Sequence, residues 1–537
     1  MKIFTDKKCY LIIILLFIFQ LIILSPINEF PLNDDWVHNW AINNYVSTGQ
    51  FIYPSFLAPN MHFLMLVDFL LAKIFGFSFS LMRLANLLFA LATILIFFKL
   101  LRYLKVPIVT SLLLSLTLWF NPIFFNLSYT SMGDIPTLFM LTFAILCFCI
   151  GFDKKNYWYI FGGAMLVILG FYIRQYAIFL LFAVGIFLIF KRKEYHLNKM
   201  AVALGLPSLI LVSAYVIFYR LNWLPQEMNI HFFPLISYSK HIIISLWQYI
   251  LLFSLFLSPI SFSILAKNMK LMLSKKNLFL ASLLFFYFSL IGFILFIFGI
   301  NCLSLGNIIN LYGVGANLDV LQGQINYWVN PVFLIILNLM AICSFVILLM
   351  FTLFIKLPDK TKLLNISFVY WLILLYIILF LIIAIFDRYL LMVLPLLLIY
   401  ISQALRDYGY SKFIFLTVLL IMMAYGGIGT YDYLSWQRTR WTMGKELIAQ
   451  GVARQDIEGG YEWNGWYLYN HPELEKDFNP ELGVYLKAGS PGFKKPYVIS
   501  FSALPGYQVI EKHEAGTIFS KINYIYLNRL PAASTVQ

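Results

Sequence analysis

The sequence predicts an all-α protein that crosses a membrane many times and ends in a small α/β domain. Of its 537 residues, 61% are hydrophobic and only 12% are charged, whereas a soluble domain carries about 25% charged residues. The mean hydropathy is +0.83. Long apolar runs, separated by short clusters of Lys and Arg, continue as far as residue 430 and then stop. These observations predict a polytopic integral membrane protein with one extramembrane domain at its end.

Apolar runs long enough to cross a bilayer recur along this first part. A spanning helix needs about 20 mostly apolar residues, and about 13 stretches approach that length. The predicted spans are residues 9–26, 82–101, 106–126, 135–152, 157–173, 176–190, 200–219, 241–259, 278–300, 331–355, 363–385, 389–405 and 413–430. Lys2, Lys7 and Lys8 precede the first run, as in a signal peptide. Because no small-x-small cleavage site follows, we expect a retained signal anchor.

The distribution of Lys and Arg predicts the orientation of the spans. With the N-terminus inside, the inner loops hold 21 of these residues and the outer loops hold six. Inner loops carry the excess of positive charge in membrane proteins, so we expect the chain after residue 430 to lie outside. The same clustering between apolar runs argues against a nucleic-acid partner, although the formal net charge is +14.

The first outer loop, residues 27–81, carries an acidic pair, Asp34 and Asp35. Residues 61–75 of this loop are apolar but short for a span. We therefore expect them to form a helix at the membrane interface. If residues 61–75 crossed the membrane instead, every later loop would change side.

The tail, residues 431–537, differs from the rest of the chain because it mixes Lys and Arg with many acidic residues. Residues 496–502 and 522–527 have the pattern of strands. Residues 435–450 predict a helix that joins the last span. We therefore divide the chain into a transmembrane domain, residues 1–430, and a small outer domain of mixed α and β structure, residues 431–537.

Further ionisable residues reach the predicted outer side, where they join the acidic pair. They are Asp134, Arg174 and the neighbours Asp387 and Arg388. Ionisable groups at the edge of a span cost several kcal/mol unless they are paired or face a cavity. Their shared side therefore predicts a functional site there.

Each of these residues also has a purely structural interpretation. The acidic pair and Asp134 stand where helices begin, and Asp is a common capping residue. Arg174 and Arg388 are placed like interfacial anchors, Asp387 and Arg388 like a local ion pair, and Arg83 like a side chain that reaches from a span to the interface. For His38 and His62, in the first outer loop, the structural interpretation is favoured over substrate binding.

Paired carboxylates and arginines at a membrane surface suit group transfer from a lipid phosphate. A carboxylate accepts the proton of an attacking hydroxyl or amine, and guanidinium groups stabilise the charge that grows on a leaving phosphate. The sequence contains no Walker A motif, no HExxH, no CxxC pair and no GxGxxG motif after a strand. The histidines show no metal-ligand spacing. We therefore predict a lipid-linked donor, no cofactor and no metal site.

These motifs resemble those of the integral membrane glycosyltransferases with the GT-C fold, especially bacterial relatives of protein O-mannosyltransferases and of the aminoarabinose transferase. The resemblance rests on the thirteen-span layout, the acidic pair in a long first loop, the Ser131-Met132-Gly133-Asp134-Ile135-Pro136 hairpin, and Asp387-Arg388-Tyr389 followed by Leu394-Pro395. The tail segment Glu458-Gly459-Gly460-Tyr461-Glu462-Trp463-Asn464-Gly465-Trp466 also looks like one in bacterial members of this group.

The resemblance implies a polyprenyl-phosphate-linked sugar as donor and inversion at the anomeric carbon by direct displacement. It implies transfer on the periplasmic side of a bacterial inner membrane, to a lipid, glycan or protein acceptor. The first acid of the pair, Asp34, would then be the base, with Asp35 beside it. Arg388 would hold the donor phosphate, together with Arg174 or Arg83. The family contains both metal-dependent and metal-independent enzymes, so a divalent metal is compatible with it.

The sequence departs from the family pattern at two places. Many members have Asp-Glu with a Tyr three residues after the Glu, whereas here Asp35 is the second acid and His38 takes the place of the Tyr. The His-Pro-Pro often found before the interfacial helix is reduced to Pro59-Asn60-Met61-His62. Either acid therefore remains a candidate for the base. The alternative function is a transporter or flippase of lipid-linked sugars, which predicts charges at mid-membrane depth and interrupted helices.

Overall fold

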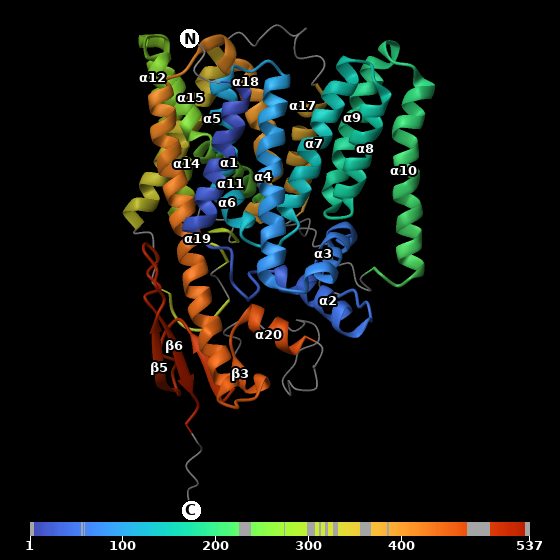
Figure 1. The fold of residues 1–537 in the computed structure, drawn as a ribbon. Helices are drawn as coiled ribbons and strands as arrows, with labels where there is room; N and C mark the ends of the chain where they lie inside the picture. The colour runs from blue at the N-terminus through green and yellow to red at the C-terminus, as the bar shows by residue number, and fades with distance from the viewer. Residues whose placement is uncertain are drawn as a thin grey trace, which may run out of the picture.

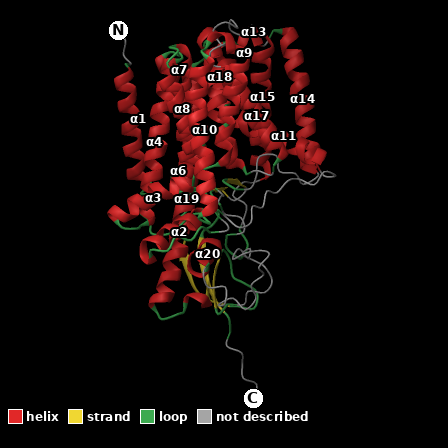
Figure 2. Ribbon diagram, turned by 90° about the vertical axis from the view of Figure 1, so that its right-hand side faces the viewer, coloured by secondary structure: helices red, strands yellow, loops and turns green. Residues whose placement is uncertain are grey.

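A computed structural model describes residues 5–54, 57, 60–224, 238–272, 274–297, 307–310, 313–316, 320–325, 331–354, 367–383, 386–469 and 495–531. A tall bundle of helices forms most of the molecule, and a small domain with a sheet lies at one end of it (Figures 1 and 2). The N-terminus lies at the opposite end of the bundle. The predicted fold class, a helical membrane protein with a small C-terminal sheet, is confirmed.

A helix lies over each of the thirteen predicted ranges. The bundle helices are α1 (Asp6–Ile23), α4 (Phe79–Tyr103), α5 (Ile108–Trp119), α6 (Pro122–Ser128), α7 (Asp134–Asp153), α8 (Tyr157–Phe171), α9 (Phe179–Lys191), α10 (Leu197–Arg220), α11 (Tyr238–Phe256), α12 (Ser258–Lys267), α13 (Met269–Met272), α14 (Lys275–Ile297), α15 (Pro331–Phe354), α17 (Ser367–Ile382), α18 (Leu394–Tyr408) and α19 (Lys412–Ala449). In the described ranges, the 3₁₀ helices η1 (Gln175–Ile178), η2 (Arg192–Glu194), η4 (Asp387–Met392) and η5 (Arg454–Asp456) lie between helices or near their ends.

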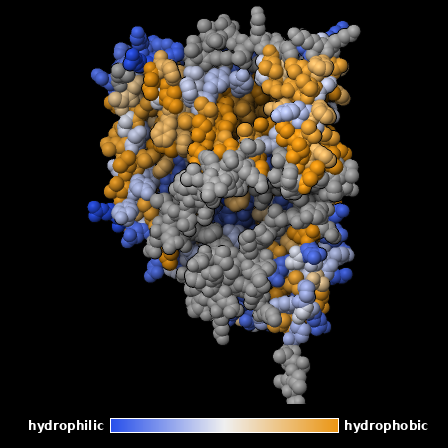
Figure 3. Space-filling view, turned by 180° about the vertical axis from the view of Figure 1, so that it is seen from behind, coloured by the Kyte–Doolittle hydropathy of each residue, from blue (hydrophilic) through white to orange (hydrophobic). Residues whose placement is uncertain are grey.

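Among the described residues, a test of helix length and composition identifies fewer candidate spans than the predicted thirteen. Within the described ranges, seven helices are long and apolar enough to cross a membrane, or nine if each of two bent pairs is one span. The pair α5–α6 bends by 65° and the pair α11–α12 by 63°. The first bend occurs at Asn121 and Pro122, where the Asn121 side chain caps α6 and Pro122 starts it. The exact number of spans stays a prediction, but the multi-pass character is clear from the apolar surface of the bundle (Figure 3).

The first loop folds into two helices across the end of the bundle that is opposite the N-terminus (Figure 1). They are α2 (Asp35–Thr48) and α3 (His62–Phe75). With 14 residues, α3 is about 21 Å long, too short for a hydrocarbon core of about 30 Å. Leu66 and Ile74 on α3 are exposed, whereas Leu64 and Met65 are buried. This arrangement fits the predicted interfacial helix and does not support a span at residues 61–75.

The C-terminal part is built on α19, which continues without a break beyond the predicted boundary at residue 430. At 38 residues it is about 57 Å long. Four strands, β3 (Ile457–Glu458), β4 (Tyr497–Ser500), β5 (Gln508–Glu514) and β6 (Tyr524–Arg529), form a sheet in the order β3-β4-β6-β5. The β3–β4 pair is parallel and the other two pairs are antiparallel. The two predicted strands correspond to β4 and β6, and the division into two domains stays a prediction.

Helix α20 (Tyr461–Leu468) connects this part to the first loop. A Cβ added at Gly465 would lie 2.4 Å from the indole of Trp36 on α2, so the absence of a side chain at 465 lets the two helices approach. Near the site, a small second sheet pairs β1 (Ile309–Asn310) with β2 (Gly313–Val314).

A buried ion pair fixes α20 to α19. Glu462 Oε2 lies 2.9 Å from Arg440 Nη1, and both side chains are fully buried. The second oxygen, Oε1, accepts hydrogen bonds from the Asn33 amide at 3.0 Å and from the Gln437 side chain at 3.2 Å. One carboxylate therefore links α19, α20 and the residue before Asp34.

We expect Glu462→Gln to lower the free energy of unfolding by about 3–5 kcal/mol, because it leaves the Arg440 guanidinium buried without a counter-charge. Thermal or denaturant unfolding of the purified protein in detergent measures this loss. Glu446→Gln is the matched control: Glu446 is also on α19 but exposed, and its change should stay within about 0.5 kcal/mol. Equal stability of the two variants would contradict a role for the ion pair.

Candidate functional site

Asp34 lies at the start of α2, but its carboxylate makes no capping hydrogen bond to that helix. Instead Oδ2 lies 2.8 Å from Arg388 Nη1, and Oδ1 accepts a hydrogen bond of 2.8 Å from the Tyr461 hydroxyl. The side chain remains 36% exposed. Burial raises the pKa of Asp34, but the Arg388 guanidinium outweighs it and the pKa falls below its ordinary value. Asp34 is therefore a partly exposed, ionised carboxylate and not a helix cap.

Asp35, the next residue, points into the protein and has a different environment. Its side chain is buried. Oδ1 accepts the Leu32 amide at 2.7 Å, and Oδ2 accepts the Ser131 amide at 3.0 Å. Asp35 thus ties the first loop to the hairpin before α7. The residue before the pair, Asn33, has a φ of 54°, which is unusual for a residue other than Gly.

We expect Asp35 to make stability depend on pH. Burial raises the pKa of Asp35 to about 6, against about 3.9 in an unfolded chain. Between about pH 4 and pH 6 the folded protein holds a proton that the unfolded chain has lost, so the free energy of unfolding falls as pH rises through this window. Asp35→Asn removes this titration and leaves one of the two amides without an acceptor, at a cost of about 1–3 kcal/mol.

Thermal unfolding of the wild type and of Asp35→Asn across that pH window tests both effects. The decrease in the free energy of unfolding with rising pH should become less steep in Asp35→Asn. It should not vanish, because burial also raises the pKa of Asp387 to about 6. Asp34→Asn is the control. It should keep the slope that Asp35 causes, because the pKa of Asp34 is shifted in the other direction. An unchanged slope in Asp35→Asn would contradict the assignment.

Asp134 and Arg174 form a second ion pair near Asp34. Arg174 Nη2 lies 3.1 Å from Asp134 Oδ2, and the Tyr176 hydroxyl lies 3.4 Å from Oδ1. Both charged side chains are buried. A Cβ at Gly133 would lie 2.9 Å from Ile173 and 3.6 Å from Arg174 Nε, so Gly133 keeps room for this approach. Nε of Arg174 is buried and has no hydrogen-bond partner among the described residues.

Arg388 comes from η4, between α17 and α18. Phe386 and Tyr389 flank its guanidinium, with ring centroids 5.2 and 5.6 Å away. Its Nε is buried without a partner in the described part of the chain. The neighbouring Asp387 does not pair with Arg388: its carboxylate accepts the amides of Ile308 and Ile309 at 2.6–3.0 Å. The local ion pair that the sequence suggested as an alternative is therefore wrong.

These two ion pairs form one cluster of four charges, Asp34, Asp134, Arg174 and Arg388. Burial lowers the pKa of Arg388, but Asp34, and after it Asp134, raise the pKa above its ordinary value. Arg174 in turn contributes to the low pKa of Asp34. Each arginine thus interacts with both carboxylates. The structure brings together four residues that the sequence placed on one side of the membrane.

Arg83, predicted as a phosphate ligand, has a different position. Its guanidinium donates to the carbonyl oxygens of Pro26, Asn28 and Phe30 at 2.9–3.0 Å. The side chain is buried inside the first loop. These contacts show a structural anchor for the segment before Asp34. They do not place Arg83 with Arg174 and Arg388.

The two predicted histidines also lie outside the four-charge cluster. His38 Nε2 lies 3.4 Å from Asp68 Oδ2, and both side chains are buried between α2 and α3. His62 Nε2 contacts the Trp223 carbonyl oxygen at 2.8 Å, and its ring stacks on Phe218 at 4.0 Å. Among the described residues, no group of three or more His, Cys, Asp and Glu is arranged to hold a metal ion. Metal dependence was not tested by this observation and stays a prediction.

Tyr461 is the site residue that sequence reasoning missed. It belongs to the tail segment that the resemblance pointed out, but nothing in the pattern showed that its hydroxyl reaches Asp34, 427 residues earlier. The Tyr461 amide donates to the Val320 carbonyl oxygen at 2.9 Å, which fixes the start of α20. The part of the chain that follows α19 therefore contributes directly to the site.

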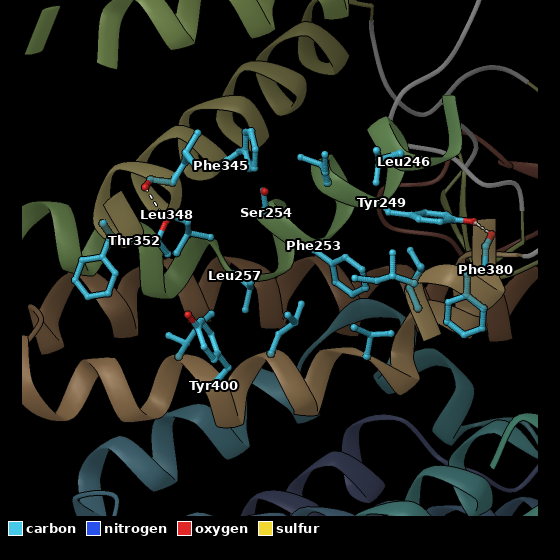
Figure 4. Close-up of a pocket in the computed structure, with 18 residues that line it drawn as sticks. Leu246, Tyr249, Phe253, Ser254, Leu257, Phe345, Leu348, Thr352, Phe380 and Tyr400 are labelled. Atoms are coloured by element: carbon cyan, nitrogen blue, oxygen red, sulfur yellow. Dashed lines mark hydrogen bonds between the residues drawn. The ribbon is translucent and has the colours of Figure 1, made fainter. Parts of the chain in front are cut away.

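An apolar cavity of about 330 Å³ begins beside η4. Figure 4 shows side chains of α11, α15, α17 and α18 around it. Leu390 and Val393, which follow Arg388 closely, line it together with Phe253, Leu257 and Tyr400. The Tyr249 hydroxyl, at the edge of this cavity, donates to the Phe380 carbonyl oxygen at 2.6 Å. The cavity can hold an apolar chain, and two of its lining residues, Leu390 and Val393, follow Arg388 by two and five residues.

Comparison with known proteins gives one family match. Residues 59–218 match the family model described as dolichyl-phosphate-mannose-protein mannosyltransferase. This segment contains α3, the hairpin before α7, Asp134 and Arg174. A comparison with curated protein sequences gave no match.

Three solved structures show a distant likeness. ArnT from Cupriavidus metallidurans bound to undecaprenyl phosphate is 11% identical, with a TM-score of 0.38 over 97% of this chain and 98% of that chain. ArnT from the same organism in the apo state is 12% identical, with a TM-score of 0.37 over 80% of each chain. The protein O-mannosyltransferase complex of S. cerevisiae bound to the sugar donor is 15% identical, with a TM-score of 0.35 over 41% of this chain.

The match to the yeast chain spans about a third of its length, 34%. The resemblance stated from the sequence is confirmed by the family match. The segment that carries α3, Asp134 and Arg174 is similar to the dolichyl-phosphate-mannose-protein mannosyltransferase family.

Proposed function

We propose that the protein is an inverting glycosyltransferase that moves a sugar from a polyprenyl-phosphate carrier to an acceptor. One observation carries this proposal: the Asp34 carboxylate is partly exposed and stands against the buried guanidinium of Arg388. A base for the acceptor and a cation for the leaving phosphate are thus adjacent. The transfer would take place on the periplasmic side of a bacterial inner membrane, where the C-terminal part of the chain would also lie.

The chemical step is a direct displacement. Asp34 accepts the proton of an acceptor hydroxyl or amine while that atom attacks the anomeric carbon. The bond between the anomeric carbon and the phosphate oxygen breaks, and polyprenyl phosphate leaves with the electron pair. Arg388 and Arg174 stabilise the charge on the departing phosphate. No covalent enzyme intermediate forms, so the anomeric centre is inverted.

Binding of the donor would also activate the base. In the protein without donor, Arg388 lowers the pKa of Asp34, which makes Asp34 a weak base. A donor phosphate competes with Asp34 for the guanidinium of Arg388. As that cation is shared with phosphate, the pKa of Asp34 rises toward neutral pH, where general bases are most effective. The Tyr461 hydroxyl keeps the carboxylate in place during this exchange.

The apolar cavity beside η4 supports a lipid as the carrier. A polyprenyl chain is purely hydrocarbon and needs an apolar path from the phosphate site into the bilayer. Leu390 and Val393 line the cavity, and Arg388 precedes them on the same segment. A carrier phosphate at Arg388 would therefore have its first isoprene units beside this cavity. A nucleotide-linked sugar has no hydrocarbon chain that this apolar cavity could bind.

Sugar transfer in proteoliposomes tests the proposal. Wild-type protein is incubated with a panel of labelled polyprenyl-phosphate sugars and a membrane extract as acceptor source, and the release of polyprenyl phosphate is followed. We expect donor consumption with inversion at the anomeric carbon. If no donor is consumed while labelled lipid-linked sugar crosses the bilayer, the protein is a flippase and the proposal fails.

A further inference from the structure

The loop between β5 and β6 carries two adjacent exposed apolar side chains. Ile518 is 61% exposed and Phe519 is 51% exposed. In the described part of the chain after residue 431, the other exposed large hydrophobic side chains are Val509 and Ile510 on β5. Exposed apolar residues that gather on one element indicate contact with a partner. Strand β5 is also the outermost strand of its sheet.

This loop has a fixed shape because it wraps around a carboxylate of α19. Asp432 Oδ1 accepts the Ile518 amide at 2.6 Å, and Oδ2 accepts the amides of Phe519 and Ser520 at 2.8 and 2.6 Å. Asp432 is buried beneath the loop. Ser435 also donates to the Gly516 carbonyl oxygen at 3.2 Å. The exposure of the two apolar side chains is therefore enforced by the main chain and not by a loose conformation.

The contact with Asp432 sets the depth of the loop relative to the membrane. The apolar range of α19 ends at residue 430, and Asp432 is two residues further, about 3 Å along the helix axis. Earlier on α19, within its apolar range, the Leu420 and Ile421 side chains are exposed, as expected of side chains that face lipid. Figure 1 shows the connection between β5 and β6 beside α19, directed toward the bundle and away from the far end of the sheet. The loop thus stands at the level where α19 leaves the apolar layer.

We propose that the β5–β6 connection is a membrane-interface contact, in which Ile518 and Phe519 insert into the boundary between lipid headgroups and acyl chains. The headgroup layer is about 5–8 Å thick on each side of the hydrocarbon core, so a side chain anchored about 3 Å beyond the end of the apolar range reaches it. The neighbouring Lys521 is exposed and suits contact with lipid phosphates. The contact holds the sheet against the bilayer at a second point besides α19. It depends neither on the direction in which the chain is inserted nor on the proposed transferase activity.

A lipid surface fits this loop better than a second copy of the chain. The β5–β6 connection that carries the apolar pair lies beside α19 at the end of the sheet nearest the bundle, and α19 is long and apolar enough to cross a membrane. A protein partner would have to bind within the headgroup layer to cover the pair. At that level the lipid headgroups themselves cover the pair, so no protein partner is needed.

Spin labelling in nanodiscs tests the proposal. Phe519→Cys is labelled in a full-length chain whose five native cysteines are replaced by Ala, and collisions with oxygen and with a water-soluble nickel chelate are compared. Ile510→Cys is the matched control, because Ile510 is also apolar and 45% exposed but lies earlier on β5. We expect a gain of oxygen collisions and a loss of chelate collisions at 519 relative to 510.

Two results would overturn the proposal. One is equal access of the chelate to both positions, which would place the loop in water. The other is protection at 519 that appears only in nanodiscs with two copies, together with dipolar broadening between their labels, which would identify a second copy as the partner. Ile518→Cys, labelled in the same way, provides an independent second position if the variant at 519 does not fold.

Discussion

Asp34→Asn is expected to slow sugar transfer strongly and to leave the protein folded. The substitution keeps the size of the side chain and removes the oxygen that takes the acceptor proton. General-base catalysis contributes about 10²–10⁴-fold to a rate, and we expect a loss in that range. The loss of stability should be smaller than for Glu462→Gln, because the Asp34 side chain is 36% exposed and an amide still accepts from the Tyr461 hydroxyl. Single-turnover release of polyprenyl phosphate in proteoliposomes measures the loss.

Asp35→Asn is the matched control for this experiment, since it is the same chemical change one residue later. Asp35 holds two amides and is closed off from the site, so its variant should lose stability and keep a larger share of the transfer rate per folded molecule. If Asp35→Asn is folded but silent while Asp34→Asn retains activity, the base has been assigned to the wrong acid. If both retain activity, neither carboxylate is the base.

The pH dependence of the wild type adds a sharper test of the same residue. The base acts in its ionised form, so the rate falls as pH drops through the pKa of Asp34. Arg388 holds that pKa below its ordinary value in the protein without donor. A bound donor phosphate competes for Arg388, so the pKa of Asp34 rises. The acid limb should therefore lie at higher pH for kcat, which reports the complex, than for kcat/KM, which reports the free enzyme. Coincident limbs would mean that the donor does not compete for Arg388.

The sequence predicted the side of the membrane on which the charged residues meet, but not their partners. Asp34, Asp134, Arg174 and Arg388 each follow or precede an apolar run, and the count of Lys and Arg in the loops was enough to place them on one side. What each side chain contacts depends on packing between segments far apart in the chain. Tyr461 is the clearest case, because its hydroxyl reaches Asp34 only after α20 has packed on α2.

Backbone contacts explain the two assignments that the structure changes. The family resemblance implied Arg83 as a possible phosphate ligand, yet its guanidinium donates to three carbonyl oxygens of the first loop. A local ion pair between Asp387 and Arg388 was the structural alternative, yet the amides of Ile308 and Ile309 bind both oxygens of Asp387. Main-chain groups are present at every residue, so no sequence pattern reveals which of them will bind a given side chain. The interfacial helix and the two strands were easier to predict from the sequence, because periodicity and segment length are local properties.

Arg388→Ala is expected to weaken both donor binding and transfer. Loss of one group that stabilises a developing anion costs about 10²–10³-fold in rate, and the carrier phosphate also loses its nearest cation. Arg388→Lys should recover only part of the activity, because an ammonium group is a point charge whereas a guanidinium binds two phosphate oxygens in a fixed plane. Single-turnover rates and equilibrium binding of labelled carrier in detergent separate the two effects.

Arg83→Lys distinguishes a phosphate ligand from a structural arginine. Three donor–carbonyl contacts in the first loop require the planar guanidinium, so this variant should be less stable and should bind carrier normally per folded molecule. Arg388→Lys should show the reverse, normal stability with weakened binding, because Nε of Arg388 has no partner to lose in the described residues. Should Arg388→Ala bind the carrier as tightly as the wild type, the phosphate site is elsewhere. Arg174, whose Nε has no hydrogen-bond partner among the described residues and whose Nη2 pairs with Asp134, would then be the next arginine to replace.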